Sequence, residues 1–296
     1  MSITTGMLVA DLQHRFQAAG LPEPKLDARL LLSHLLGYGL TDLTVNPDRI
    51  LSDDEVNRVR SAADRRCQRE PVHRILGRRA FHAIELELSP ATLEPRPDTE
   101  TLVETALPRA RAKVLETGTC RIADLGTGSG AICLALLVAV PEAVGLGTDI
   151  SLAALETALL NARSNGVSRR FTTCHGHWFD AVCGTFDLIV SNPPYIPSAD
   201  IAALEPEVRE FDPPRALDGG PDGLDAYRHI AAGAGAHLAE GGYVCLETAA
   251  DQHRAVIDLF HGHGFACVER ARDMAGHDRA VVFQRGDSLL TEADEL

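Results

Sequence analysis

Asp124-Leu125-Gly126-Thr127-Gly128-Ser129-Gly130-Ala131 is the stretch that decides the fold of this chain. Residues 121–125, with Ile122, Ala123 and Leu125, predict a strand that ends in this stretch, and residues 130–139 predict a helix that begins in it. The glycines permit positive φ and let the backbone approach a ligand closely. A strand, a glycine loop and a helix in this order are typical of nucleotide-binding α/β domains.

From about residue 98 the chain alternates between predicted strands and helices. Strands are expected at 121–125, 144–149, 171–174, 187–191, 243–248, 266–270 and 280–284, and helices at 99–113, 130–139, 152–165, 224–239 and 251–263. Only residues 271–279 separate the last two strands, too few for a helical crossover, so that pair is expected to be antiparallel. The fold class is therefore α/β, with a doubly wound, seven-stranded, Rossmann-like sheet.

The chain before this sheet has a helical pattern. Leu8, Leu12 and Phe16 recur at helical spacing, and Ser52 with Glu55 forms a capping box at the start of a later helix. Residues 80–88 alternate in part and prolines follow, which predicts a hairpin and a stiff connector. We expect a helical domain at 1–72, a hairpin connector at 73–97, the α/β domain at 98–286 and a disordered acidic tail at 287–296.

Composition limits the classes of protein that this chain can represent. Apolar residues make up 45% and the net charge is −14, which favours a packed core and argues against a protein that coats nucleic acid. Eight arginines nevertheless fall within residues 58–79. This basic stretch is either a solvated helix face or a docking surface for an acidic or RNA-associated partner.

The cysteines and the apolar runs indicate the compartment. Seven cysteines are scattered without a Cys-x-x-Cys pair, a pattern that fits reduced thiols rather than a disulfide framework. The start of the chain lacks a secretory signal, and the longest apolar run, 131–140, is far shorter than a membrane span. We expect a soluble, cytoplasmic protein that binds no membrane and requires no metal.

The glycine loop alone fits two kinds of cofactor. Gly126-x-Gly128-x-x-Ala131 satisfies the dinucleotide fingerprint, and Asp149 after the next strand could hold ribose hydroxyls in either case. A nicotinamide enzyme also needs an acid or base placed for hydride transfer, and none is evident. A sulfonium cofactor mainly needs positioning, with Asp124 suited to its ammonium group. Trp178 either covers an adenine ring or packs in the core.

Asn192-Pro193-Pro194-Tyr195 follows the predicted strand 187–191 and suits the binding of a planar NH2 group. Asn192 supplies a side-chain oxygen and Pro193 a main-chain carbonyl, so both N–H groups of a carboxamide would find acceptors. These acceptors also stabilise the positive charge that develops on the nitrogen as a methyl group arrives. The prolines fix φ, and Tyr195 could stack on the planar group and exclude water.

These residues resemble the class I S-adenosylmethionine methyltransferases, and most closely the HemK-type release factor glutamine methyltransferases. The segments that carry the resemblance lie at 70–72, 94–100, 124–131, 148–151, 187–196, 216–224 and 273–279. The departures from the family pattern are Glu94, His177 and Thr248-Ala249. None of them touches the Asn192–Tyr195 motif.

The resemblance implies transfer of a methyl group from S-adenosylmethionine to the side-chain nitrogen, N5, of the glutamine in the Gly-Gly-Gln loop of peptide chain release factors. Release factors are then the protein partners, with the helical domain recognising them, no stable nucleic-acid binding, and a monomeric enzyme. The cofactor would be held by residues from four segments: Gly126, Thr127, Gly128, Ser129, Gly130, Asp149, Trp178 and Asn192.

The same resemblance assigns the substrate side. The glutamine would be bound by Asn192, Pro193, Pro194 and Tyr195, of which Asn192, Pro193 and Tyr195 are the expected catalytic residues. Three alternatives stay open: a ribosomal-protein glutamine methyltransferase, an adenine-N6 nucleic-acid methyltransferase, and a dinucleotide-binding or inactive cofactor-sensing module. Within the basic stretch, Arg65, Arg66 and Arg69 are predicted to grip the release factor away from the glutamine loop.

Overall fold

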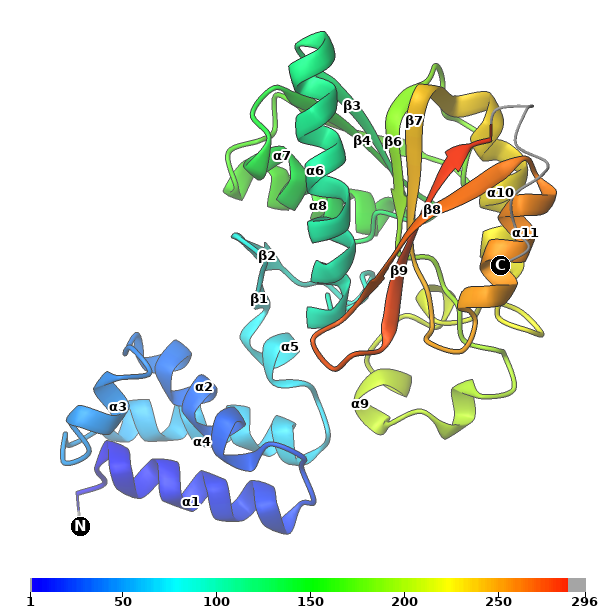
Figure 1. Cartoon of the computed structure of the whole chain (residues 1–296). Coiled ribbons are helices and arrows are strands. Elements are labelled where there is room, and N and C mark those ends of the chain that lie inside the picture. The colour runs from blue at the N-terminus through cyan, green and yellow to red at the C-terminus, as the bar shows by residue number, and fades with distance from the viewer. Residues whose placement is uncertain (1, 287–296) are drawn as a thin grey trace. The chain divides into compact units, whose positions relative to one another are not determined.

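The computed structural model describes residues 2–286 (Figure 1). The chain forms two compact units: residues up to Arg78 together with Glu205–Phe211, and Arg79–Leu204 together with the residues from Asp212 onward. The acidic tail predicted at 287–296 lies outside the described residues. Every helix within residues 2–286 is too short or too polar to traverse a bilayer.

The second unit is built on a seven-stranded sheet, and the predicted fold class is confirmed. Its strands are β3 (Cys120–Leu125), β4 (Ala143–Asp149), β5 (Phe171–His175), β6 (Phe186–Ser191), β7 (Leu238–Glu247), β8 (Phe265–Arg272) and β9 (Asp278–Arg285). They lie in the order β5-β4-β3-β6-β7-β9-β8. The first five are parallel, and β9 runs antiparallel to both β7 and β8, as the short 271–279 connection predicts.

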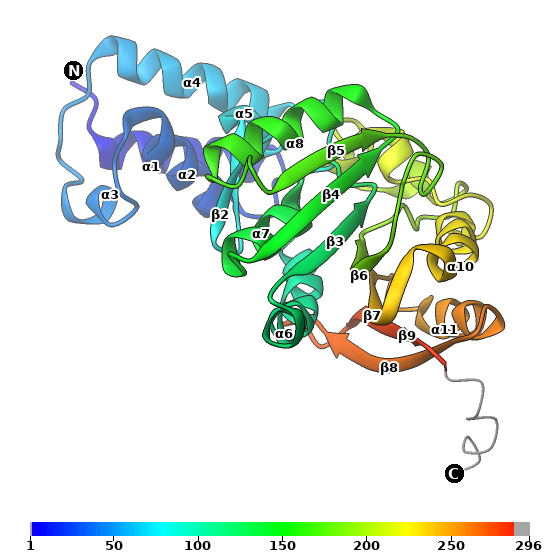
Figure 2. The ribbon, with the colours of Figure 1, turned by 90° about the horizontal axis from the view of Figure 1, so that it is seen from above.

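Helices cover both faces of this sheet (Figure 2). One face carries α6 (Glu100–Thr117), α7 (Ala131–Ala139) and α8 (Leu152–Ser164), and the other carries α10 (Asp225–His237) and α11 (His253–Gly262). Each face has its own apolar core. Strands β3 and β6 are buried along nearly their whole length, as expected for parallel strands that are covered on both sides.

The register of the central strands positions the site. Ile122 of β3 pairs with Leu188 of β6, and the Ser191 hydroxyl at the end of β6 donates to the Leu125 carbonyl at 2.6 Å. The glycine loop and the Asn192–Tyr195 motif therefore leave the sheet side by side. This edge, where the carboxyl ends of adjacent parallel strands diverge, is where α/β sheets bind ligands.

The predicted hairpin consists of β1 (Arg78–Phe81) and β2 (Ile84–Glu87), which form a separate two-stranded sheet. Phe81 and Leu86 are buried in the first core, and the Asn161 side chain of α8 accepts from the Glu87 N–H at 2.7 Å. Asn161 also donates to the Ser129 carbonyl at 2.9 Å, which ties the hairpin to the glycine loop. Glu94, an acidic residue where the family pattern is apolar, is buried and accepts from Arg79.

The first unit is a helical bundle. Its helices are α1 (Thr5–Ala18), α2 (Pro24–Leu36), α3 (Asp42–Val45), α4 (Asp53–Cys67) and α5 (Val72–Leu76), and the capping box at Ser52 and Glu55 is present. Leucines, valines and phenylalanine from these helices make a third core. Helix α5 falls in residues expected to belong to the connector.

A short segment from far along the chain completes this unit. Helix α9 (Pro206–Arg209) lies within Glu205–Phe211, which sequence analysis placed inside the α/β domain. Arg66, only 4% exposed, donates to Asp27 at 2.7 Å and to Glu207 at 3.2 Å. Arg69 pairs with Glu207 at 2.8 Å. A buried arginine between two carboxylates holds the segment in place.

These ion pairs bear on the test of the basic stretch 58–79, whose docking role stays a prediction. Arg65 bonds Glu70, Arg66 is buried, and Arg69 is committed to Glu207. Reversing these three charges would place carboxylates against the carboxylates of Glu70, Asp27 and Glu207, with the buried position 66 the most severe. Such variants test the fold of the bundle and not docking of a partner.

Candidate active site

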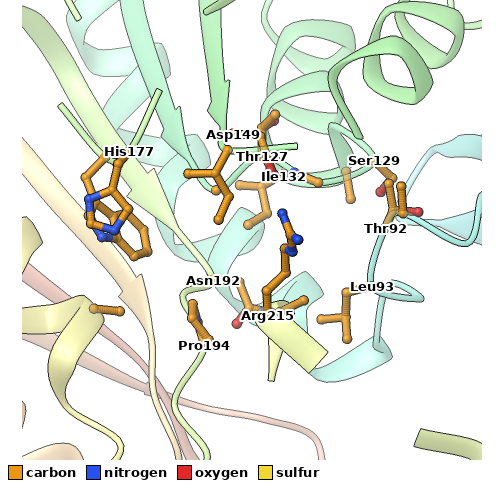
Figure 3. A pocket seen from close by; sticks show the side chains of 18 of the residues that line it. Thr92, Leu93, Thr127, Ser129, Ile132, Asp149, His177, Asn192, Pro194 and Arg215 are labelled. Atoms are coloured by element: carbon orange, nitrogen blue, oxygen red, sulfur yellow. Dashed lines mark hydrogen bonds between the residues drawn. The ribbon is translucent and has the colours of Figure 1, made fainter. Parts of the chain in front are cut away.

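A pocket of about 370 Å³ opens at the carboxyl ends of β3, β4 and β6 (Figure 3). All of its lining residues belong to the second unit. They come from the glycine loop, the ends of β4 and β5, the Asn192–Tyr195 motif, the connector at 91–99 and the segment 215–229. Its volume is within the range of small-molecule sites.

The glycine loop forms one wall of the pocket. Gly126, Gly128 and Gly130 have φ of 68°, 54° and 85°, values that other residues adopt only with strain. A Cβ on Gly130 would lie 2.8 Å from Leu134, so this glycine also lets the loop approach α7. Thr127 is fixed by donating its N–H to the Thr148 carbonyl at 2.8 Å.

Asp149 lines the pocket at the end of β4, as predicted. Its Oδ2 accepts from the Gly128 N–H at 3.0 Å and its Oδ1 from the Ser151 N–H at 2.8 Å. Two backbone donors therefore hold the carboxylate in one orientation. Each oxygen keeps a further lone pair that a ribose hydroxyl could use.

Asp124 has a different position from the one that sequence analysis suggested. It is 1% exposed and does not line the pocket among the described residues. Its Oδ2 accepts from the Thr127 hydroxyl at 2.8 Å and from the Cys133 N–H at 3.3 Å. Burial raises the pKa of this carboxyl to about 7. Asp124 thus shapes the glycine loop from behind.

His177 and Trp178 reach the pocket from the end of β5. Trp178 has a φ of 48°, an outlier for a bulky residue. Its ring comes close to the glycine loop, because a Cβ on Gly126 would lie 3.7 Å from it. The His177 ring meets the His229 ring edge-on, with 4.9 Å between centroids. Strained backbone of this kind clusters at functional sites.

The structure divides the Asn192–Tyr195 motif into two parts. Asn192 and Pro194 line the pocket, whereas Pro193 and Tyr195 are absent from its described lining. The Tyr195 ring packs against the second core, and burial raises its pKa to about 12. The Asn192 side-chain nitrogen donates to the Thr99 hydroxyl at 3.1 Å. The stacking role of Tyr195 stays a prediction.

The segment 216–224 supports this motif from behind. Ile196 donates its N–H to the Leu217 carbonyl at 3.0 Å, and its own carbonyl accepts from Gly219 at 2.9 Å. Gly223, at φ 75°, approaches so closely that a Cβ would lie 2.3 Å from the Tyr195 carbonyl oxygen. The glycines of this segment are thus required by close backbone contact.

Sequence reasoning missed several lining residues, among them Thr92, Leu93, Thr99, Arg215 and His229. Figure 3 shows Arg215 extending toward Thr127 and Ile132 of the opposite wall. Thr92 and Leu93 lie in a loop, Thr99 and Arg215 in short 3-10 helices and His229 in α10, and no periodicity marks any of them as part of a pocket. The one available signal was the family resemblance of 94–100, which includes Thr99, and of 216–224, which begins directly after Arg215; it gave no side chain a place in the pocket.

The pocket suits S-adenosylmethionine. The glycine-lined wall leaves room for a methionine part, the Asp149 carboxylate has lone pairs that a ribose hydroxyl could use, and Trp178 and Ile150 offer apolar surface on which an adenine ring could lie. Arg215 provides a positive charge near the glycine loop, where a carboxylate would lie. The donors, acceptors and apolar surface present thus match the parts of this molecule.

Comparison with known proteins agrees with this geometry. Residues 8–77 match the model of the PrmC N-terminal domain, and residues 103–204 match the methyltransferase small domain. The chain is 51% identical to the release factor glutamine methyltransferase of Agrobacterium fabrum over 92% of this chain and 94% of that protein. The corresponding enzyme of Rhodospirillum rubrum is 48% identical over 96% of this chain and 86% of its own length.

Solved structures support the fold. A methyltransferase from Pyrococcus furiosus gives a TM-score of 0.51 at 20% identity, over 70% of this chain and 92% of that one. The hMettl16 catalytic domain gives a TM-score of 0.55 at 12% identity, over 81% of this chain and 86% of that one. Glycine loop, motif, helical unit and relatives lead to one conclusion: this chain belongs to the release factor glutamine methyltransferases.

Proposed function

We propose that this protein transfers a methyl group from S-adenosylmethionine to N5 of the glutamine in the Gly-Gly-Gln loop of peptide chain release factors. The observation that carries the proposal is the meeting of the glycine loop and Asn192 in one pocket. The enzyme is a methyltransferase, and release factors are its substrates. The finer assignment concerns which atoms react and which residues hold them.

The chemistry explains why an asparagine stands at this place. A carboxamide nitrogen is a poor nucleophile because its lone pair is delocalised into the carbonyl. Asn192 Oδ1 and the Pro193 carbonyl would accept its two N–H groups and aim the nitrogen into the pocket. As positive charge develops on that nitrogen, the same oxygens stabilise it. S-adenosylmethionine, when bound, supplies a methyl group that is already activated.

The remaining residues bind and exclude water. Gly126, Thr127, Gly128, Ser129 and Gly130 would cradle the methionine part, and Arg215 would pair with its carboxylate. Asp149 would accept from the ribose, and Trp178 would cover the adenine. Pro194 would close the pocket beside the target amide, with Tyr195 supporting it from the core side.

The wider setting is proposed on the same ground. The helical unit recognises the release factor, and the enzyme acts as a cytoplasmic monomer that forms no stable complex with nucleic acid. A net charge of −14 supports the last point, since strongly acidic surfaces repel phosphate backbones. Sedimentation of the purified protein, alone and with duplex DNA, tests the monomeric state and the absence of stable nucleic-acid binding.

The decisive experiment supplies labelled S-adenosylmethionine with one acceptor at a time: a release factor, the same factor with its loop glutamine replaced by alanine, or duplex DNA. Label in the intact factor alone supports the proposal. Label in DNA would refute it, as would equal label in the two factors.

Asn192→Ala tests the assigned mechanism. Removing a group that stabilises developing charge costs about 10²–10³-fold in kcat. We expect a loss of this size while the dissociation constant for the cofactor changes little, measured by titration calorimetry. An active Asn192→Ala enzyme would exclude the role given to this side chain.

A further inference from the structure

Glu247 is a buried carboxyl that the proposed chemistry does not use. It is the last residue of β7, and its neighbour Leu246 pairs with Ser191 of β6. The residues that follow in each strand, Asn192 and Glu247, therefore leave the sheet at the same edge. Glu247 is 1% exposed and does not line the pocket among the described residues.

Hydrogen bonds connect this carboxyl to the active-site asparagine. Asn192 Nδ2 donates to the Thr99 hydroxyl at 3.1 Å, and hydrogen bonding from Thr99 and, to a smaller extent, from Asn192 lowers the pKa of the neighbouring Glu247 carboxyl. A hydroxyl has one proton. Because Thr99 accepts from Asn192, its own proton is available to Glu247, so the chain of donors runs from Asn192 through Thr99 to Glu247.

The carboxyl of Glu247 is buried and has few hydrogen-bond donors around it. Burial raises its pKa to about 7, while the nearby charge of Arg279 lowers it and that of Asp98 raises it. Tyr227 donates its hydroxyl to the Glu247 main-chain carbonyl at 2.9 Å and not to the carboxyl. Within the described residues, Glu247 Oε2 is buried and lacks a partner. Thr99 and Asn192 are thus its principal neutral donors.

An ionised carboxylate accepts hydrogen bonds and donates none. While Glu247 is ionised, the Asn192 amide faces Glu247 and Thr99 with its NH2 group, the orientation in which Nδ2 donates to Thr99, and its oxygen turns the other way, toward the pocket that Asn192 lines. We propose that Glu247 is a positioning residue that acts through Thr99 to fix the Asn192 amide with its oxygen toward the target glutamine. This inference rests on the proposed function, in which Asn192 holds that glutamine.

The orientation matters because the two ends of an amide are nearly equal in shape and opposite in hydrogen bonding. With Oδ1 in the pocket, Asn192 accepts from the substrate NH2 and stabilises positive charge on its nitrogen. With Nδ2 in the pocket, two N–H groups would oppose each other. A fixed amide also removes a rotation that would otherwise be lost when the substrate binds.

Three single variants test the proposal in the full-length enzyme. Glu247→Gln and Thr99→Val are expected to lower kcat by about 10- to 100-fold, the size of loss typical when a hydrogen-bond partner that orients a metal-binding side chain is removed. The dissociation constant for S-adenosylmethionine should stay within about twofold of wild type. Thr105→Val is the matched control and should keep wild-type kcat, because the hydroxyl of this buried threonine of α6 donates to the Thr101 carbonyl of its own helix.

Thr99→Ser separates hydrogen bonding from packing. It keeps the hydroxyl and removes a methyl group, whereas Thr99→Val keeps the shape and removes the hydroxyl. We expect Thr99→Ser to be the more active of the two. The reverse order would indicate that shape matters and would overturn the relay.

A residue exchange gives the sharpest result. Asn192→Asp alone sets two carboxylates against each other and should lose activity. Adding Glu247→Gln again places an NH2 group between positions 192 and 247, but this group now belongs to residue 247 and the carboxylate to residue 192. We expect the double variant to recover about tenfold in kcat over Asn192→Asp, since interacting residues are non-additive. A purely structural Glu247 would give no recovery.

The outcomes also distinguish this inference from the function on which it rests. A fully active Asn192→Ala enzyme removes the proposed role of Asn192. An inactive Asn192→Ala enzyme beside a Glu247→Gln enzyme of wild-type kcat leaves the function standing and rejects the positioning role. Loss of cofactor affinity or of folded protein in Glu247→Gln likewise rejects it in favour of a structural one.

Discussion

At the scale of single residues, the site depends on buried carboxyls that have few partners. Asp124 supports the glycine loop and Glu247 supports the asparagine, and neither lines the pocket. Both lie below the ends of strands, where the sheet excludes water. Burial raises the pKa of each to about 7. The enzyme therefore places ionisable groups behind its reactive residues.

Asp124 gives a prediction on stability and pH. Its pKa is raised from 3.8 to about 7, so the folded state favours the protonated form. The protonated Asp124 carboxyl therefore stabilises the folded state. Its contribution to the free energy of unfolding is complete below pH 3.8 and is lost as pH rises through about 7. In wild type the free energy of unfolding should decline between these two pH values, and Asp124→Asn should make that decline smaller by an amount on the order of a few kcal/mol.

Urea denaturation of both proteins from about pH 4 to about pH 8, at intervals of about half a unit, measures this slope. Glu247 titrates in the same direction, so the variant should retain part of the decline. Parallel curves for wild type and Asp124→Asn would show that the carboxyl is not buried in the way described.

At the scale of elements, backbone packing around the Asn192–Tyr195 motif is the critical feature. Gly223 has a φ of 75°, and a Cβ there would lie 2.3 Å from both the Tyr195 carbonyl oxygen and Gln252 Nε2. Gly223→Ala combines strain with a clash and should cost about 1–3 kcal/mol in stability. It should also lower kcat, because the motif must shift to make room.

Gly166→Ala is the control for that variant. Gly166 has nearly the same φ, 74°, but a Cβ there meets nothing within 4 Å. It carries the strain without the clash, so stability should fall by about 1–2 kcal/mol while kcat is retained. Equal loss of kcat in both variants would mean that the 216–224 segment does not support the motif.

The elements were predictable from the sequence to a much greater extent than the pocket. Strands such as 121–125 and 187–191 are mainly apolar segments between loops, and burial on both faces favours that pattern. Thr99, Arg215 and Glu247 reach the site through the meeting of segments that are far apart along the chain. Neither periodicity nor spacing contains that information, so their positions emerged only from the structure.

At the scale of the whole molecule, the chain crosses between its two units more than once. The segment Glu205–Phe211 joins the helical unit although its neighbours on both sides belong to the other one. Its anchor is Arg66, which is buried between Asp27 and Glu207. The sequence could not reveal this, since acidic residues in a loop have no visible partner before the chain folds.

Arg66→Ala tests the anchor. The substitution leaves Asp27, 6% exposed, as an unpaired buried carboxylate. Breaking a buried pair by removing one partner costs about 3–5 kcal/mol. Chemical denaturation should detect a loss of this size for the transition of the helical unit. Arg58→Ala, which alters an exposed arginine of the same helix, should change stability by less than about 0.5 kcal/mol. If Arg66→Ala and Arg58→Ala both changed stability by a similarly small amount, Arg66 would not be the residue that anchors Glu205–Phe211.

The excursion of Glu205–Phe211 also has a consequence during synthesis. The helices up to Arg78 leave the ribosome first, but the carboxylate of Glu207 that pairs with Arg66 and Arg69 is made only after residues 79–204. At about 5–20 residues per second that delay is roughly 6–25 s. During this interval Arg66 and Arg69 of the nascent bundle lack the carboxylate of Glu207. The helical unit is therefore incomplete until the segment Glu205–Phe211 has been synthesised.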